Sequence, residues 1–411
     1  MGFSVLLLLW SVALAAQPLT LEGAVEHALN NNPGLKALWN GVLASRHRPS
    51  QVGALPDPRL TFRAVNLPAE SFDPGLEPMS QLQIGFSQRF PFPGKLSLKE
   101  EAARLEVEIA KARFREARLQ LIFRVKRLWW RLFALDRSLE KLGEARQLLR
   151  QFLKVAEVRY RVGQGLQQDV LLAQLELSRL VDREWELLRE RRDLAAELNA
   201  LLDRPAAAAV QLPREVALRF PERIDRKRLE ERAFTTRPLL LAARLEIARA
   251  ERQLALAKRD LFPDVTLSAA YGVRTRFRDF ATLGITIDLP LYASKKQLQA
   301  IRERARERER RYHRLREAVR RIGAEIETAL NDFQKAREQL ELLESSILPQ
   351  ARQTVASMLA AYQVGKVDFL NLVRAELLLL EHQIDYYRRL AEVETAIARL
   401  AAAIGVEEIQ P

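Results

Sequence analysis

Four short segments of the chain alternate apolar and polar residues with a period of two. In LQIGFSQRF (82–90), Leu82, Ile84 and Phe86 fall on one face and polar or small residues on the other, and LGITIDLPL (283–291) repeats this pattern. Such alternation is typical of β-strands, and strands of about nine residues cross a bilayer in a tilted barrel. For any one segment, an ordinary half-buried hairpin is the alternative. The pattern predicts strands at about 59–67, 81–90, 264–273 and 282–291.

Long segments with helical periodicity follow each pair of strands. No proline interrupts the pattern from Leu96 to Val162, and about 67 helical residues would extend roughly 100 Å. Pro349 lies inside the third such segment, where we expect a kink or a short break. Helices of this length without a globular core bury their apolar stripes against one another as coiled coils. We predict long helices at 95–162, 166–202, 294–364 and 367–404.

The second half of the chain repeats the first. YRVGQG (160–165) and YQVGKV (362–367) begin 202 residues apart (362 − 160), and each interrupts a helical pattern at a glycine. Each half has the same order of elements: two short helices with a proline between them, two strands, a long helix, a glycine turn and another long helix. We therefore divide the mature chain into a first structural repeat at 17–213 and a second at 214–411.

The expected fold class is mainly α with a small β part. Four strands cannot close a barrel, and open strand edges are not tolerated in lipid. If the strands are embedded in a membrane, several copies must therefore share one barrel, and three copies would supply twelve strands, an even number as in bacterial barrels. The pattern thus predicts duplicated half-chains with long coiled-coil helices, and twelve strands from three copies are one way to close the barrel.

Composition excludes several classes of function. The chain contains no cysteine, so it has no disulfide, thiolate nucleophile or zinc–thiolate site. Four scattered histidines and three methionines form no metal-binding motif. No G-x-S-x-G, H-E-x-x-H, P-loop or dinucleotide-binding glycine motif occurs. The sequence therefore predicts no enzyme activity, no catalytic residue, no cofactor and no metal site.

The net charge of +13 does not indicate a nucleic-acid partner. Arginines alternate with glutamates, as in RERARERERR (302–311), which is typical of a solvated helix face. No motif that reads a nucleic-acid groove accompanies the charge. We therefore expect no nucleic acid among the partners.

The first residues have the pattern of a secretory signal peptide. An apolar run from Phe3 to Ala16 ends in small residues, although Lys and Arg are missing before it. We expect cleavage near Ala15 or Ala16, so that 1–16 is the signal peptide. Without a cysteine the mature chain has no lipid-acceptor site, and no later stretch reaches the length of a transmembrane helix.

The duplicated pattern resembles the TolC-like outer-membrane efflux proteins of Gram-negative bacteria. The resemblance covers most of the mature chain and rests on the paired Tyr-x-x-Gly turns, on NNNPGLKAL and TTRPLLLAA, and on two strand exits. These exits are RFPFPGKLSLKEEAA (89–103) and LPLYASKKQLQAIRERA (289–305). SQRFPFPGKLSLK is also similar to the heavy-metal branch of the family, linked to cobalt-zinc-cadmium exporters.

The resemblance implies a homotrimeric, passive conduit for small molecules or metal ions. Four strands per chain would contribute to a trimeric 12-stranded β-barrel in the outer membrane, in contact with lipid. The helices would form a long coiled-coil α-helical barrel that projects across the periplasm. It would join a periplasmic adaptor (membrane fusion) protein and an inner-membrane pump, for which a proton gradient is favoured over ATP.

The resemblance also places the two glycine turns together at the periplasmic end of the helices. There they would form the rim that the adaptor contacts and the mouth that opens. Glycine suits such reversals because it adopts left-handed backbone angles at little cost. Simple solvent exposure is the alternative for the side chains. The expected tip and adaptor-contact residues are Tyr160, Gly163, Gly165, Asp169, Tyr362, Gly365 and Asp368.

The entrance gate departs from the family pattern. Where related proteins often carry acidic residues after the second turn, this chain has Asn371 and Arg374, and Asp368 lies one turn earlier. We therefore do not expect a strongly cation-selective ring, and an arginine-lined entrance is our hypothesis.

The tryptophans of the long helices lie at helical spacing, where an aromatic residue usually packs in the core. Trp129, Trp130 and Trp185 are predicted to pack in coiled-coil seams.

The competing function is a secreted periplasmic coiled-coil structural or adaptor protein without a barrel. The four alternating strands, at equivalent places in both halves, favour the channel.

Overall fold

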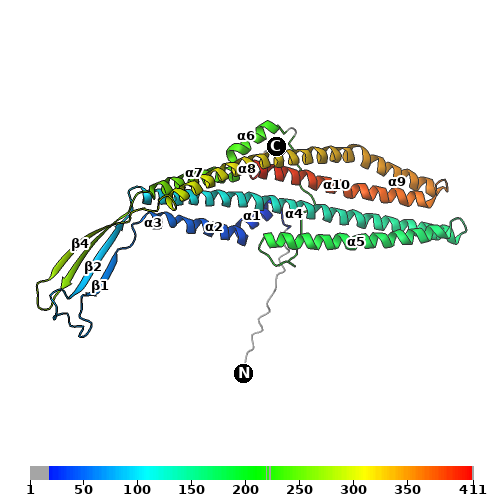
Figure 1. The fold of residues 1–411 in the computed structure, drawn as a ribbon. Coiled ribbons are helices and arrows are strands. Elements are labelled where there is room, and N and C mark those ends of the chain that lie inside the picture. Colours follow the sequence, from blue (N-terminus) through cyan, green and yellow to red (C-terminus); the bar gives the residue numbers. More distant parts are fainter. Residues whose placement is uncertain (1–17, 219, 222–223, 410–411) are drawn as a thin grey trace, which may run out of the picture. The chain divides into compact units, whose positions relative to one another are not determined.

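The computed structural model describes residues 18–218, 220–221 and 224–409, so the expected signal peptide at 1–16 lies outside the described residues. The described chain is mainly helical with one four-stranded antiparallel sheet, which confirms the predicted fold class (Figure 1). Contacts divide it into two compact units. We call residues 36–116 and 236–322 the sheet unit, and the described residues of 18–35, 117–235 and 323–409 the tip unit.

Most of the sheet unit consists of the strands and the helices next to them in sequence. Helices α4 and α8 begin in this unit and continue into the tip unit. The elements are α2 (Pro33–Arg46), α3 (Arg48–Gly53), β1 (Arg59–Val65), β2 (Gln81–Phe90), α4 (Lys95–Arg161), α7 (Pro238–Arg259), β3 (Val265–Val273), β4 (Phe280–Ile287) and α8 (Gln297–Leu342).

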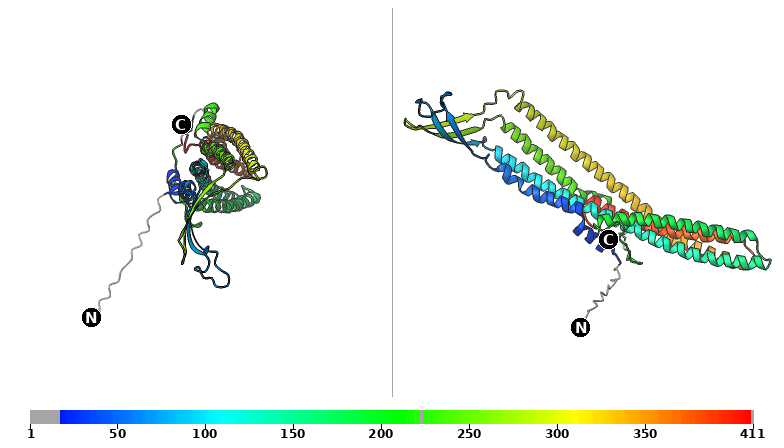
Figure 2. Two further views of the ribbon diagram at one scale, coloured as in Figure 1. Left: turned by 60° about the vertical axis from the view of Figure 1, so that its left-hand side comes forward. Right: turned by 90° about the horizontal axis from the view of Figure 1, so that it is seen from below.

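The tip unit contains two long helical hairpins, seen from two further directions in Figure 2. The first pairs α4 with α5, and the second pairs α9 with α10. The elements of this unit, besides the ends of α4 and α8, are α1 (Leu21–Asn31), α5 (Gln167–Leu201), α6 (Arg226–Thr236), the π-helical turn Leu343–Ile347, α9 (Leu348–Gln363) and α10 (Phe369–Ile404).

The sheet has one continuous apolar face that is exposed to the surroundings. The strand order is β1-β2-β3-β4, and the register places Phe62 opposite Ile84 and Ile84 opposite Tyr271. On β4 the side chain of Leu283 is 85% exposed. The opposite face carries small and polar residues, such as Gly85, because successive side chains of a strand alternate between faces. Within the chain, β1 and β4 are edge strands that each pair on one side alone.

The last strand is shorter than its sequence pattern predicts. Alternation continues to residue 291, but β4 ends at Ile287. Pro290 has no N–H to donate to a neighbouring strand. The N–H of Leu291 turns back to the carbonyl of Leu289, at 2.9 Å. The chain therefore leaves the sheet before the apolar pattern ends, and α8 begins at Gln297, not at residue 294.

A π-helical turn interrupts the long helix of the second half just before Pro349. The amide of Leu348 donates to the carbonyl of Leu343, five residues earlier. Pro349 has no N–H for the next helical hydrogen bond, and such insertions accommodate a proline within a helix. The break expected at Pro349 is present, and it takes the form of a widened turn at Leu343–Ile347.

Aromatic packing confirms two of the three predicted seam tryptophans. Trp129 is fully buried, stacks on Phe133 and meets the edge of Trp130. Its indole Nε1 donates to the carbonyl of Leu19, at 2.9 Å. The prediction for Trp185 is wrong for the single chain, because its side chain is 65% exposed. Helical spacing alone does not tell which of several apolar stripes finds a partner within one chain.

No helix among the described residues is both long enough and apolar enough to span a membrane.

A buried ion pair joins α7 to α4 within the sheet unit. Arg237, which is 3% exposed, donates from Nε and Nη2 to the two carboxylate oxygens of Glu116, at 3.0 and 2.9 Å. A two-point pair of this kind fixes the relative orientation of the two groups as well as neutralising their charge.

We expect Glu116→Ala to lower the free energy of unfolding by about 3–5 kcal/mol, because it removes the carboxylate that neutralises a buried guanidinium. Glu108→Ala is the matched control: it removes an exposed pair with Lys111 on the same helix, and its cost stays below about 1 kcal/mol. Urea unfolding of the detergent-solubilised protein measures both. Equal costs for the two variants would contradict this role of the pair.

Candidate functional site

The two glycine turns end their helices in the same way. Gly163 and Gly365 have φ of +72° and +74°, in the left-handed region. In the first turn the amides of Gly163 and Gln164 donate to the carbonyls of Tyr160 and Arg159. In the second turn the amides of Gly365 and Lys366 donate to those of Tyr362 and Ala361. This is the paired hydrogen-bond pattern of a Schellman motif, which explains why the chain repeats a glycine at both reversals.

Gly165 is constrained for a different reason. A Cβ atom at this position would lie 3.0 Å from the backbone nitrogen of Tyr160 and from the Cβ of Arg159. The equivalent residue of the second turn is Val367. The close approach of the chain is therefore particular to the first turn.

Asp169 and Asn371 occupy matching positions in the first turn of α5 and of α10. The amide of Asp169 donates to the carbonyl of Leu166, and the amide of Asn371 donates to that of Asp368, both at 3.1 Å. A carboxylate near a helix N-terminus interacts favourably with the helix dipole. This replacement of Asp by Asn thus gives the two helix starts different charges.

An arginine at the end of α4 contacts the second turn. Arg159 donates from Nη1 to the carbonyl oxygen of Tyr362, at 2.6 Å. Its guanidinium carbon lies 4.9 Å from the centre of the Tyr362 ring. The Tyr362 side chain is 4% exposed, and its ring packs 5.4 Å from that of Phe369. We call this contact between Arg159 and Tyr362 the tip clasp.

The two acidic residues of the turns act on the groups around the tip clasp. Burial raises the pKa of Asp169, and the negative charge of Asp368 raises it further, against the opposite effect of Arg159. Burial also raises the pKa of Tyr362, and the charge of Asp169 adds to this effect. Asp169 thus lies between two opposing influences, the negative charge of Asp368 and the positive charge of Arg159.

The structure brings together some of the predicted tip residues and separates others. Tyr362, Gly365 and Asp169 lie near Arg159, and Asp368 acts on Asp169. Tyr160 is exposed instead. Of the nine predicted residues, Asn371 and Arg374 lie on the exposed side of α10. Their role as an entrance gate stays a prediction.

Two features near the turns were missed by sequence reasoning. Arg159 is one, although the replacement of its equivalent by Ala361 in the second repeat is a signal of asymmetry. The other is Glu376, a buried carboxylate of α10 whose pKa is raised by burial. Among the described residues, its Oε2 accepts no hydrogen bond. Its position at helical spacing after Phe369 and Leu372 places it on the buried face.

The described parts of the chain contain no group of three or more His, Asp or Glu side chains arranged to hold a metal ion. The candidate site offers contacts between helices and exposed surface at the two turns.

Comparisons with known proteins identify the same pattern over most of the chain. A family model described as "Outer membrane efflux protein" matches residues 24–204 and 229–406, once in each half. The cobalt-zinc-cadmium resistance protein CzcC of Cupriavidus metallidurans is 21% identical over 395 residues, which cover 95% of this chain and 91% of that protein. The repeat boundary between residues 213 and 214 stays a prediction.

Solved structures share the fold. The outer membrane protein VceC of Vibrio cholerae has a TM-score of 0.78 at 21% identity, over 94% of this chain and 96% of that chain. The outer membrane channel CmeC of Campylobacter jejuni has a TM-score of 0.80 at 14% identity, over 94% and 85% of the two chains.

We expect Gly163→Ala to lower the stability of the tip by about 1–2 kcal/mol, because an L-residue is strained in the left-handed region. Gly143→Ala is the matched control. Gly143 lies inside α4 with open space around its Cβ direction, so alanine there stabilises by about 0.5–1 kcal/mol.

Hydrogen exchange of the segments around residues 160–170 measures both variants. Loss of protection in Gly163→Ala and none in Gly143→Ala is the expected result. Unchanged protection in Gly163→Ala would refute the strained-turn argument.

Proposed function

The chain belongs to the outer membrane efflux protein family, and we propose that three copies of it form one closed conduit. Members of this family are channels and not enzymes, and this chain is an outer-membrane efflux channel with a periplasmic helical portion. TolC-family channels are trimers that work in tripartite pumps. The alternative of a secreted coiled-coil protein without a barrel does not fit this family.

The observation that carries the proposal is the incomplete sheet. It has an exposed apolar face on one side and small or polar residues on the other. Such a sheet is suited to contact lipid with its apolar face and to line a water-filled lumen with its polar face. Its two edge strands need partners, because unpaired backbone groups are costly in lipid. Three copies supply twelve strands and leave no free edge.

The turns of the tip unit are the proposed contact with a periplasmic adaptor protein. Exposed apolar side chains gather there, and this exposure supports a docking role. Beyond the adaptor we place an inner-membrane pump, with a proton gradient as the favoured energy source. The exposed apolar residues of the two turns are Tyr160, Val162, Leu166 and Val364.

The tip clasp is the proposed lock of the entrance. Arg159 holds the second hairpin through one hydrogen bond and one cation–π contact. Opening would separate α4–α5 from α9–α10 at this point. The remaining predicted tip residues shape the rim: Gly163, Gly165 and Gly365 form the reversals, and Asp169 and Asp368 set the local charge.

The cargo class follows from the relatives alone. The Cupriavidus metallidurans relative is a cobalt-zinc-cadmium resistance protein, so divalent metal cations are the first class to test.

The clasp predicts a gain of conductance. In planar bilayers, Arg159→Ala is expected to raise the mean single-channel conductance several-fold, because the second hairpin loses its contact with the first. Arg161→Ala is the control: this exposed arginine contacts the carbonyl of Glu157 on its own helix. Equal conductance of the two variants would count against the lock, and a protein that forms no channel at all would refute the proposed conduit.

The arginine-lined entrance predicts weak ion selectivity. Reversal potentials in a potassium chloride gradient should show little cation preference in the wild type. Arg374→Ala should shift the preference toward cations, because it removes three positive charges from the trimer's entrance. A strong cation preference that disappears in Asp368→Ala but not in Arg374→Ala would overturn the arginine ring.

A further inference from the structure

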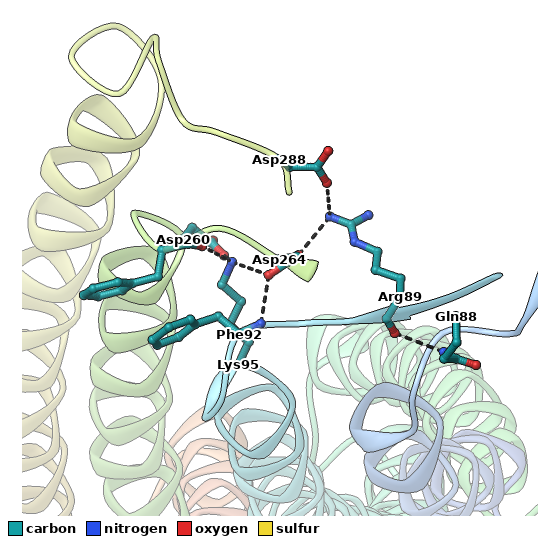
Figure 3. A network of polar contacts seen from close by, with 8 residues as sticks. Gln88, Arg89, Phe92, Lys95, Asp260, Asp264 and Asp288 are labelled. Atoms are coloured by element: carbon teal, nitrogen blue, oxygen red, sulfur yellow. Dashed lines mark hydrogen bonds and ion pairs between the residues drawn. The ribbon is translucent and has the colours of Figure 1, made fainter. Parts of the chain in front are cut away.

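An ionic network connects the two repeats at one end of the sheet, where β2 ends and β3 begins (Figure 3). The ammonium of Lys95, the first residue of α4, lies 2.8 Å from Oδ1 of Asp264 and 3.4 Å from Asp260. It also donates to the carbonyl of Phe262, at 3.0 Å. The side chains of Lys95 and Asp264 are 7% and 11% exposed. The start of α4 is thereby fixed to the turn between α7 and β3, both in the sheet unit.

Asp264 collects further donors from the end of β2. The Phe92 amide donates to Oδ1 at 2.9 Å, and Arg89 donates from Nη2 to Oδ2 at 2.8 Å. Partial burial alone would raise the pKa of Asp264, but hydrogen bonds from Lys95 and Phe92 outweigh burial and hold the pKa below its usual value. The ring of Phe92 stacks on Phe262, with 4.6 Å between centroids. We call this set of contacts the junction.

The internal repeat predicts a second junction that one chain cannot complete. The turn Phe262-Pro263-Asp264 before β3 corresponds to Leu55-Pro56-Asp57 before β1. The strand exit at 90–95 corresponds to 289–294, which follows β4, and two lysines come directly after it at 295 and 296. In one chain, however, β1 and β4 are the opposite edges of the sheet. Their residues are therefore left exposed where those of the first junction are covered.

We propose that the exit of β4 in one copy docks on the turn before β1 in the next copy and forms a second junction there. Lys295 and Lys296 supply the ammonium groups that face Asp57 of the neighbouring copy. Leu291 and Tyr292, both exposed, cover Leu55 in the way that Phe92 covers Phe262. This inference rests on the proposed trimer and specifies which residues join its copies.

The first junction also gives the strand register of the second. Phe90 pairs with Val265 within the chain, so Leu289 should pair with Pro58 of the next copy. Thr286 then lies opposite Thr61, and Ile287 lies opposite Leu60. This register continues the apolar face of β4 directly into that of β1.

Charges that played no part in the alignment agree with this register. It places Asp288 opposite Arg59 of the next copy, and opposite charges on facing residues stabilise a strand pair. Both side chains are exposed in the single chain, where Asp288 also lies 3.6 Å from Nη2 of Arg89. The same register brings the two lysines to the end of the sheet at which Asp57 lies. Two acid–base pairs would thus meet across one interface.

Disulfide trapping tests the register, because the natural chain has no cysteine. The test variant carries Thr61→Cys and Thr286→Cys, which face each other in the proposed register. Facing residues of paired antiparallel strands have Cα atoms within about 5.5 Å, a distance that suits a disulfide. Within one chain the two strands are three strand spacings apart, about 14 Å, so any disulfide must join two copies. Arg63→Cys with Thr286→Cys is the control, since it is out of register by two residues and about 7–8 Å apart.

We expect covalent trimers on non-reducing gels from the first pair, at a yield at least about tenfold above the control, given the strict distance limit for a disulfide. A higher yield from the control pair overturns the register. No disulfide from either pair, in protein whose mass in detergent is that of a trimer, overturns the junction while the proposed function stands. A monomeric mass refutes the trimer itself.

A charge reversal tests the ionic part of the junction in the same background. Asp57→Lys should lower the trimer yield several-fold, and adding Lys295→Asp and Lys296→Asp should restore it. Glu77→Lys, the same charge change in an exposed loop of the sheet unit, should leave the yield unchanged. An equal loss from Asp57→Lys and Glu77→Lys, or failure of the double reversal to restore the yield, overturns the pairing of Asp57 with the lysines.

Discussion

Backbone hydrogen bonding at the edges of a four-stranded sheet is the constraint on which this structure depends. β1 and β4 each have one side without a partner in the chain, and the sheet between them presents Phe62, Leu283 and their neighbours to the surroundings. Lipid accommodates such a face, but it does not accommodate unpaired amides and carbonyls, which cost several kcal/mol each. Pairing with further copies satisfies both requirements at once. Because the chain is an internal repeat, the strand pairing that joins its two halves can recur between neighbouring copies.

The internal repeat shapes both the sheet unit and the tip unit, but its two copies are not equivalent. Both turns of the tip unit use the same pair of hydrogen bonds around a left-handed glycine. Their side chains then differ: Arg159 corresponds to Ala361, and Asp169 corresponds to Asn371. The first hairpin therefore supplies the cation that holds the second. In each chain the first hairpin donates the contact and the second hairpin accepts it. Two identical repeats would not differ in this way.

The sequence predicts much of the fold because period-two and helical patterns are local. Alternation locates β2 at Gln81–Phe90, and the glycine turns locate the ends of α4 and α9 within two residues. Alternation fails at the end of β4, where Pro290 removes a donor although the apolar pattern continues. It also fails for Trp185, because helical spacing does not say which stripe is covered within one chain. Contacts between residues far apart in sequence are beyond such patterns. The bond from Arg159 to Tyr362 and the collection of donors around Asp264 both depend on how the two repeats meet.

The central claim is that the sheet lies in lipid as one part of a barrel closed by other copies. Spin labels at single cysteines along β4, from residue 281 to residue 287, test it most directly in protein reconstituted into liposomes. The account predicts a period of two: oxygen, which concentrates in lipid, should relax labels at residues 283, 285 and 287, and a water-soluble nickel complex should relax those at 282, 284 and 286. Access of the nickel complex to both faces of β4 would contradict the account, because it would place the apolar face of the sheet in water.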